Sequence, residues 1–239
     1  MTDAWWAGRA GAPPGAPLSA AAEPTLQPLP WRLQDPPPLA LPPASEPLLL
    51  LLDCRDTLPP AMRDDLLMTF SAAEHQRHQA YRRPDDRERF LRGRTGLRSL
   101  LAAWLGCPAA AVRIEIGAHG KPFCPNGPPF NVSHSGDLIL LALHPHQKVG
   151  VDVEQLRPGL DWQPIAQRVL TAPQRQALNQ LPAPARLEGF LAQWCTLEAE
   201  LKATGTGLAG REHQQSAALR RWRLQLPAGY LGAVALMPD

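Results

Sequence analysis

Residues 148 to 154 read Lys148-Val149-Gly150-Val151-Asp152-Val153-Glu154, in which valines alternate with glycine and two acidic residues. Alternation with a period of two is typical of a β-strand, and it puts the valines on one face and both carboxylates on the other. The simpler interpretation is the polar face of an edge strand. The alternative is a site at which a cation joins the two like charges.

A second acidic segment, residues 194 to 205, reads Trp-Cys-Thr-Leu-Glu-Ala-Glu-Leu-Lys-Ala-Thr-Gly. On a helix, Trp194, Glu198 and Lys202 fall on one line beside an apolar stripe, so Glu198 is expected to be partly desolvated. Carboxylates near a core are costly unless a cation joins them. Asp152, Glu154 and Glu198 are therefore candidate ligands for Mg²⁺, which prefers oxygen donors. A simple ion pair between Glu198 and Lys202 is the alternative role for this lysine.

Two glycine-containing segments supply candidate anion contacts. They are Gly120-Lys121-Pro122 and Phe130-Asn131-Val132-Ser133-His134-Ser135-Gly136. Lys121, Ser133 and His134 offer hydrogen-bond donors, and the glycines allow close approach of the backbone. Taken alone, Lys121 could be a solvated loop lysine, and His134 a structural histidine that caps a turn.

The remaining periodicity predicts helices and largely antiparallel strands, and so an α+β fold. A strand is predicted at residues 48–52, and helices between 60 and 105, with a break at Pro84 and a capping box at Ser71 to Glu74. Further strands are predicted at 112–116, 138–143 and 148–154, helices at about 162–181 and 185–204 with a stop at Gly205, and a terminal hairpin at 220–226 and 230–236.

Composition narrows the class of protein. The formal net charge of the 239 residues is only +2, which does not favour nucleic acid as a partner. Four scattered cysteines without a CxxC pair argue against a zinc site or a disulfide framework, and no apolar run is long enough to cross a membrane. We therefore expect a cytoplasmic protein that does not act at a membrane. Residues 1–47 contain twelve of the 28 prolines and are expected to form a mostly disordered arm.

The four motifs GKP, FNVSHSG, GVDVE and WCTLEAELKATGTGL resemble, in order and spacing, the Sfp-type 4'-phosphopantetheinyl transferases over roughly residues 48–236. The resemblance implies a pseudo-twofold arrangement of two similar α/β halves, residues 48–146 and 147–239, with coenzyme A held in the cleft between them. The resemblance also implies the activity of the family. This is the transfer of 4'-phosphopantetheine from coenzyme A to a serine of an apo acyl or peptidyl carrier protein, with release of 3',5'-ADP.

The same resemblance implies roles for individual residues. Asp152, Glu198 and, in some members, an acid at the position of Glu154 hold Mg²⁺. Coenzyme A is contacted by four further side chains besides Lys202, namely Arg77, Lys121, Ser133 and His134. Lys202 offsets charge on the departing 3',5'-ADP, and the candidate base is Glu198 or a metal-bound water that Glu198 orients. This chain departs from the family at Leu197, where members usually carry lysine.

Two other functions stay open at this point: a nucleotide pyrophosphate hydrolase, and a non-catalytic module that binds coenzyme A or a carrier protein. A carrier protein is usually acidic around its modified serine, so a basic or apolar docking surface is expected, partly from residues 124–129 and the neighbouring Phe123. Members of the resembled subgroup commonly act as monomers, which is the expectation here.

Overall fold

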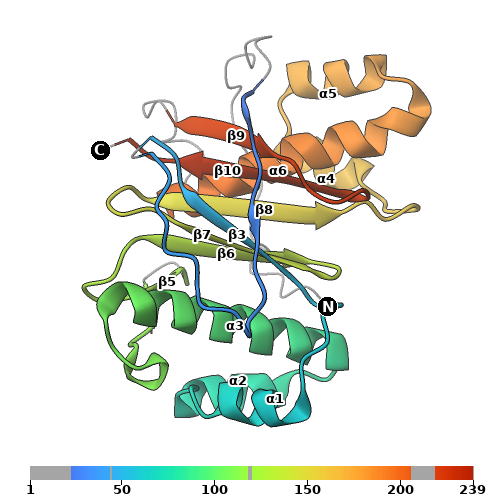
Figure 1. Ribbon diagram of the computed structural model, residues 1–239. Coiled ribbons are helices and arrows are strands. Elements are labelled where there is room, and N and C mark those ends of the chain that lie inside the picture. The colour runs from blue at the N-terminus through green and yellow to red at the C-terminus, as the bar shows by residue number, and fades with distance from the viewer. Residues whose placement is uncertain (1–22, 44, 118–119, 206–218, 239) are drawn as a thin grey trace.

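The computed structural model describes residues 23–43, 45–117, 120–205 and 219–238. Within them, two four-stranded sheets lie face to face between two layers of helices (Figure 1). The first sheet has the order β2-β3-β7-β6 and the second the order β1-β9-β10-β8. The predicted α+β class with two similar halves is confirmed.

The sheet of the first half is built from β2 (Leu29–Pro30), β3 (Leu48–Asp53), β6 (Phe130–Ser135) and β7 (Leu138–Leu143). Its helices are α1 (Pro60–Leu67), α2 (Ala72–Ala80) and α3 (Pro84–Leu105). A short 3₁₀ turn, η1 (Ala109–Ala111), leads to a small hairpin of β4 (Glu115–Ile116) and β5 (Pro122–Phe123).

The sheet of the second half is built from β1 (Thr25–Leu26), β8 (Val149–Gln155), β9 (Arg220–Leu224) and β10 (Tyr230–Leu236). Its helices are α4 (Gln163–Val169), α5 (Ala172–Gln180) and α6 (Arg186–Thr204), with the 3₁₀ turn η2 (Ala183–Ala185) before α6. No helix in the described part of the chain is long and apolar enough to cross a membrane.

Alternate faces of the strands explain the layers. Leu50, Ile139 and Leu141 lie in one cluster with α3, whereas Leu138 and Leu140 lie in a second cluster with the valines of β8. Because side chains of a strand point to opposite faces in turn, one leucine-rich strand serves both clusters. The apolar run of β7, buried at all six positions, is therefore the middle of the molecule.

The helical layer of the first half is fixed by a buried ionic cluster. The capping box at Ser71 is present, and its Glu74 also accepts hydrogen bonds from Arg98 of α3, at 2.6 and 2.9 Å. Arg94 pairs with the same carboxylate at 3.3 Å. The arginines of this region are thus partly occupied in joining α2 to α3.

In the second half, α6 lies unusually close to β8. A Cβ atom at Gly150 would come within 2.0 Å of the carbonyl oxygen of Ala199, so only glycine fits there. The helix ends at Gly205, which adopts a left-handed φ of 73°, as its sequence predicts. This close approach brings the last two turns of α6 over the acidic strand.

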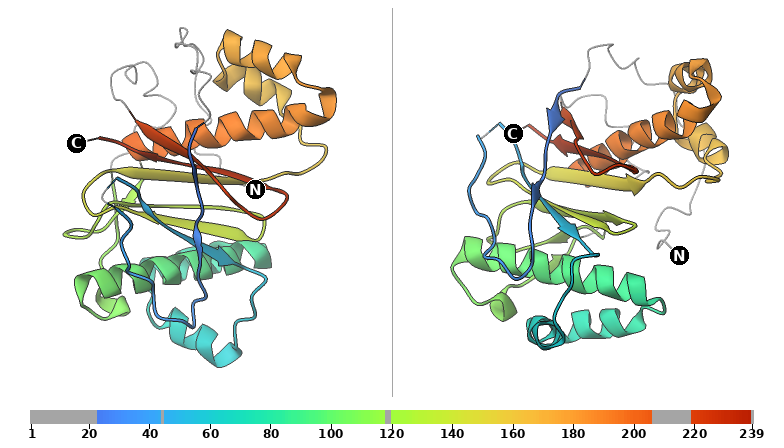
Figure 2. Two further views of the ribbon diagram at one scale, coloured as in Figure 1. Left: turned by 45° about the horizontal axis from the view of Figure 1, so that its top comes forward. Right: turned by 45° about the vertical axis from the view of Figure 1, so that its right-hand side comes forward.

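The predicted disordered arm differs from the structure over residues 23–43 and 45–47. Here β1 pairs in parallel with β9 and β2 pairs in parallel with β3, so the segment crosses one edge of both sheets (Figures 1 and 2). Trp31, only 5 % exposed, packs into the cluster under α3. The proline-rich composition suggests that the conformational entropy cost of ordering this segment would keep it disordered. Burial of the Trp31 indole and the backbone pairing offset that cost. Residues 1–22 of the predicted arm lie outside the described part.

Three other elements differ from expectation. The strand predicted at 112–116 is restricted to Glu115–Ile116, because Val112 caps η1 and its carbonyl oxygen accepts a hydrogen bond from Arg98 at 2.9 Å. The helical region 162–181 is divided into α4 and α5 at Thr171, whose side chain begins a new capping box. The segment 130–135, for which anion contacts but no secondary structure are predicted, is a regular strand.

Candidate active site

The two sheets meet at the edges formed by β6 and β8, and side chains join them. The backbone N–H groups of Val151, Val153 and Gln155 donate to the side chains of Asn131, Ser133 and Ser135, at 2.9, 3.3 and 3.1 Å respectively. Because strand side chains alternate, residues 131, 133 and 135 reach β8 from the same face. The seam between β6 and β8, overlain by α6, is the place where the predicted site residues gather.

Asp152 lies in this seam, 4 % exposed, with its carboxylate between β6 and α6. Its Oδ1 accepts hydrogen bonds from Ser133 Oγ at 2.9 Å and from Lys202 Nζ at 2.6 Å. Burial would lower the pKa of Lys202, but Asp152, Glu198 and Glu154 outweigh it and raise that pKa above its ordinary value. Lys202 is therefore a firmly charged ammonium held against the acidic cluster.

Glu154 stands one pleat beyond Asp152, and its Oε2 accepts a hydrogen bond from Ser135 Oγ at 2.8 Å. Burial and the neighbouring charge of Asp152 raise the pKa of Glu154, although Ser135 and Lys202 oppose the rise. A carboxylate whose ionisation is opposed by burial and by a neighbouring carboxylate marks a site that a further cation would stabilise.

Glu198 is 6 % exposed on α6, four residues before Lys202 and hence on the same side of the helix. Its charge acts on Lys202 together with that of Asp152. The structure thus brings Asp152, Glu154, Glu198, Lys202 and Ser133 into one region from three separate elements.

The carboxylates are not grouped tightly as they stand. Within the described residues, no three His, Cys, Asp or Glu side chains are placed so that they could hold a metal ion directly. One observation nevertheless fits a cation: Asp152 Oδ2 is buried without a hydrogen-bond partner. An orphaned carboxylate oxygen beside a second carboxylate with a raised pKa matches the oxygen donor set that Mg²⁺ uses.

His134 lies on the other face of β6 from Ser133 and keeps an exposed edge. The surrounding protein removes water from its ring and lowers the pKa of the imidazole, and the charges of Arg89 and Lys202 lower it further. A neutral imidazole at neutral pH is a hydrogen-bond donor and acceptor rather than a cation.

A basic hollow of about 270 Å³ lies beside this face, at the β6–β7 turn. Arg83, Arg89 and Arg157 line it together with two aspartates, and Arg89 donates to the carbonyl oxygen of Gly136 at 2.9 Å. These three arginines are not among the predicted site residues, and they come together only because the start of α3 lies beside the end of β8.

The ammonium of Lys121, predicted to contact a phosphate, is bound to backbone carbonyl groups in this structure. Its Nζ donates to the backbone carbonyls of Val149, at 3.0 Å, and Lys202, at 2.5 Å. Desolvation, with the charges of Lys148 and Lys202, lowers the pKa of Lys121 to about 8. In this structure Lys121 joins the start of β8 to the end of α6, and its contact with a phosphate stays a prediction.

Arg77 is a predicted contact that the structure places well away from the seam. It is exposed on α2, which lies beyond α3 from the sheets (Figure 1). Its guanidinium lies 5.5 Å from the ring centroid of Phe90 and donates to the Tyr81 hydroxyl at 3.4 Å. These contacts belong to the outer helical layer.

The departure at Leu197 is accommodated by packing. Its side chain adjoins the cluster of Phe190, Trp162 and Trp194, in which the ring of Phe190 stacks between the two indoles. Leucine therefore contributes to the core of the second half, and no cation stands at this position.

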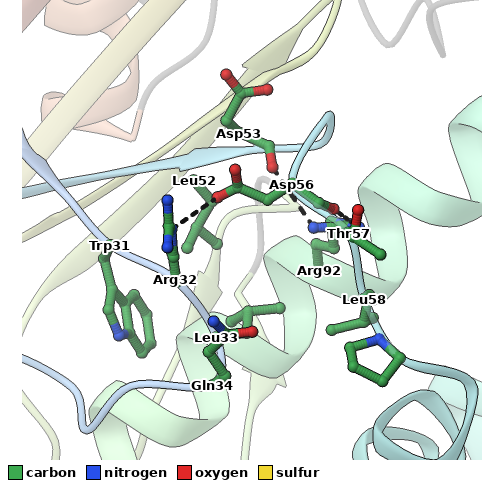
Figure 3. Close-up of a pocket in the computed structure, with 11 residues that line it drawn as sticks. Trp31, Arg32, Leu33, Gln34, Leu52, Asp53, Asp56, Thr57, Leu58 and Arg92 are labelled. Atoms are coloured by element: carbon green, nitrogen blue, oxygen red, sulfur yellow. Dashed lines mark hydrogen bonds and ion pairs between the residues drawn. The ribbon is translucent and has the colours of Figure 1, made fainter.

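A second, larger hollow of about 380 Å³ lies away from the seam. It opens between the docked segment 31–34, the end of β3 and the loop before α1 (Figure 3). Arg92 crosses its floor and donates to the backbone carbonyls of Asp53 and Asp56, at 3.4 and 2.6 Å. None of the acidic candidates lines this cavity.

The missed part of the seam had a readable signal. Asn131 and Ser135 are not among the predicted site residues, but they alternate with the predicted Ser133 at a period of two, which is the strand pattern. Their role as hydrogen-bond acceptors for a neighbouring strand could have been inferred only from knowing which edge faces them.

Comparison with known proteins agrees with this arrangement. A family model described as "4'-phosphopantetheinyl transferase superfamily" matches residues 148–232, and one described as "4'-phosphopantetheinyl transferase, N-terminal" matches residues 62–146. The first range contains β8 and α6 with their acidic residues, and the second contains α3 and β6.

Three curated relatives carry the same name. The 4'-phosphopantetheinyl transferase HetI of Nostoc sp. is 36 % identical over 159 residues, which cover 64 % of this chain and 67 % of the relative. AcpT of Escherichia coli strain K12 is 36 % identical over 121 residues, 50 % of this chain and 58 % of its own length. The transferase psf-1 of Bacillus pumilus is 32 % identical over 126 residues, 52 % and 53 % of the two chains.

The alignments thus span between about half and two thirds of the length of these relatives. The order of motifs, the two halves and the matches agree, and the chain belongs to the 4'-phosphopantetheinyl transferase superfamily.

Proposed function

We propose that the seam between β6, β8 and α6 binds coenzyme A with Mg²⁺ and passes its 4'-phosphopantetheine group to a serine of an acyl or peptidyl carrier protein. The class of reaction, phosphopantetheinyl transfer, is that of the family. The observation that supports this location is the buried pairing of Asp152 with Lys202 and Ser133, next to Glu154 and Glu198.

Asp152, Glu154 and Glu198 would hold the Mg²⁺. When bound, the ion would neutralise the diphosphate of coenzyme A as a Lewis acid. The orphaned Asp152 Oδ2 and the raised pKa of Glu154 support this assignment, since each is relieved by a nearby cation. Ser133 and Ser135 orient the carboxylates of β8 through their hydroxyl groups.

In the proposed step, the carrier serine oxygen attacks the β-phosphorus of coenzyme A. A new oxygen–phosphorus bond forms, the bond to the bridging oxygen of 3',5'-ADP breaks, and the serine proton passes to Glu198 or to a water that Glu198 orients. Lys202 offsets the negative charge that develops on the departing diphosphate oxygen. Both groups come from α6, four residues apart, and can serve one reacting phosphate.

The nucleotide portion carries a further phosphate, for which this chain offers His134 and the basic hollow of Arg83, Arg89 and Arg157. The positive charge of the three arginines suits a phosphate dianion, and the neutral imidazole of His134 can donate a hydrogen bond to it. We keep Lys121, Ser133 and His134 as proposed contacts to coenzyme A. Arg77 stays a proposal with less support, because its present partners are Tyr81 and Phe90.

The test is incubation of the protein with coenzyme A, Mg²⁺ and an apo carrier protein, followed by intact-mass measurement of the carrier. A gain equal to one phosphopantetheinyl group is expected, with loss of turnover in Glu198→Gln. Glu200→Gln is the matched control, because Glu200 is the next carboxylate on α6 and pairs with Arg221. Equal turnover by Glu198→Gln and wild type would remove Glu198 from the role of base.

The same mixture separates the two other functions. Breakdown of coenzyme A without a carrier would support a pyrophosphate hydrolase, and binding without turnover a non-catalytic module. Family membership favours neither. The proposed carrier surface includes Phe123, which is 44 % exposed on β5. If Phe123→Ala left the carrier KM unchanged, this segment would be excluded from the surface.

We also propose that the protein acts as a monomer in the cytoplasm, with no nucleic acid or membrane as partner. The low net charge and the absence of a membrane-spanning helix among the described residues are compatible with this proposal. Light scattering of the purified protein, with and without coenzyme A, tests the oligomeric state.

A further inference from the structure

Lys202 already occupies one oxygen of the Asp152 carboxylate, Oδ1, and leaves only Oδ2 without a hydrogen-bond partner. Its Nζ donates to Asp152 Oδ1 at 2.6 Å and to Ser133 Oγ and the carbonyl oxygen of Val151, both at 3.3 Å. The carboxylate oxygen is the acceptor with the shortest contact. The ammonium thus supplies the positive charge that the buried Asp152 needs.

A divalent ion and this ammonium cannot both use Asp152 Oδ1 in the same way. Repulsion between a bound Mg²⁺ and a lysine so close to the same oxygen would be strong at a site that is largely shielded from water. The arrangement also explains why the acidic residues do not form a ready cation site among the described residues. The carboxylate of Asp152 accepts a hydrogen bond from Lys202, and that of Glu154 accepts one from Ser135.

We propose that Lys202 is an internal counter-cation, which neutralises Asp152 in the metal-free protein and must leave that carboxylate when a divalent ion binds. This inference rests on the proposed metal site. Lys202 belongs to the last turn of α6 and has a flexible four-carbon stem, so a small rotation can take its ammonium from Asp152 to a neighbouring acceptor.

A phosphate of coenzyme A is the acceptor of suitable chemistry. In the absence of a phosphate, displacement of Lys202 leaves an ammonium without its carboxylate, which opposes metal binding. In its presence the ammonium gains a new anionic partner, so the metal and the nucleotide each tighten the binding of the other. The two ligands are therefore expected to load together, and Mg²⁺ alone to bind weakly.

The test uses Mn²⁺ as the probe and measures its dissociation constant by electron paramagnetic resonance and calorimetry. The proteins are wild type, Lys202→Met, Lys202→Arg and Asp152→Asn, each without nucleotide and with 3',5'-ADP. Without nucleotide, Lys202→Met should bind Mn²⁺ about tenfold more tightly than wild type, a change of about 1.4 kcal/mol. Lys202→Arg keeps the charge and should stay close to wild type, and Asp152→Asn should lose binding.

Addition of 3',5'-ADP should tighten Mn²⁺ binding more in wild type than in Lys202→Met, because only wild type has a lysine to relocate. If Lys202→Met does not fold, Lys202→Gln removes the same charge while keeping a hydrogen-bond donor, and the same tightening is expected.

The outcomes separate this inference from the metal site on which it rests. Equal or weaker Mn²⁺ binding by the uncharged variants, with binding still dependent on Asp152, would overturn the counter-cation and leave the metal site standing. No Mn²⁺ binding by any of the proteins, with or without nucleotide, would overturn the proposed metal site itself.

Discussion

Replacement of Gly150 by alanine tests whether the close contact of β8 with α6 sets the geometry of the site. The added Cβ would lie 2.0 Å from the carbonyl oxygen of Ala199 and 2.3 Å from the amide nitrogen of Ala203. Both are backbone atoms, so a side-chain rotation cannot relieve the clash. Restoring a 3.0 Å contact with the oxygen requires α6 to move away by about 1 Å.

That movement has two expected effects. Overpacking of a well-packed contact costs about 1–3 kcal/mol, which for a chain of this size lowers the Tm by about 2–4 °C per kcal/mol. A displacement of about 1 Å in Lys202 and Glu198 relative to Asp152 should also lower kcat, by about 10²-fold. Urea denaturation gives the first quantity, and carrier phosphopantetheinylation at saturating coenzyme A gives the second.

Gly93→Ala in α3 is the matched control. Its Cβ would meet Ile139 Cγ2 at 3.5 Å, an ordinary contact, and alanine is favoured over glycine in a helix by about 1 kcal/mol. This variant should be as stable as wild type or more so, with unchanged kcat. A Gly150→Ala protein with wild-type stability and kcat would refute the view that β8 and α6 are in rigid contact.

Trp31→Ala should lower the free energy of unfolding, measured by chemical denaturation, by about 3–5 kcal/mol. Leu29→Ala, at a position that is 47 % exposed, should have little effect. Similar losses in the two variants would contradict the idea that the N-terminal segment docks through the Trp31 indole. Glu74→Gln leaves Arg98 buried without its counter-charge and should cost about 3–5 kcal/mol near neutral pH. Burial opposes ionisation of Glu74, but Arg98 and the capping hydrogen bond outweigh it and hold its pKa below the ordinary 4.5, so the stability it provides is present above pH 4.5 and is lost as the pH falls. A wild-type stability curve as flat below pH 4.5 as that of Glu74→Gln would show that this pair is not the cause. Folding lowers the pKa of Lys121 from 10.5 to about 8, so between these pH values the unfolded chain binds more protons than the folded one and the stability should rise with pH. In thermal melts at a series of pH values, Lys121→Met should lose this rise. Retention of the full slope by Lys121→Met would disprove the desolvated position of the lysine.

Much of the fold could be predicted because local signals agreed with tertiary structure. The alternation in β8, the apolar run of β7, the capping box at Ser71 and the stop at Gly205 each have a local physical cause, and each is present. Elements whose order depends on a distant partner could not be predicted in this way. The strands of residues 25–30 are short and proline-flanked, and they exist because β9, at the far end of the chain, and β3 accept them as neighbours.

The site, like the fold, has features that the local sequence predicts and features that depend on distant parts of the chain. Asp152, Glu154, Glu198 and Lys202 could be chosen from spacing and family resemblance, and the structure brings all four to one seam. The actual partners of the lysines could not be chosen. Lys121 binds two backbone carbonyls that lie far from it in sequence, and the arginines of the basic hollow come together only when the start of α3 meets the end of β8.

The segment that crosses both sheets determines how the two halves can move. Thr25–Leu26 and Leu29–Pro30 are consecutive in the chain yet hydrogen-bonded to different sheets, on the side opposite the β6 and β8 edges. The halves cannot part on that side without stripping strands from an edge. Any opening should therefore be a hinge rotation whose axis runs along residues 25–30, with the largest excursion at the acidic edge where substrates would enter.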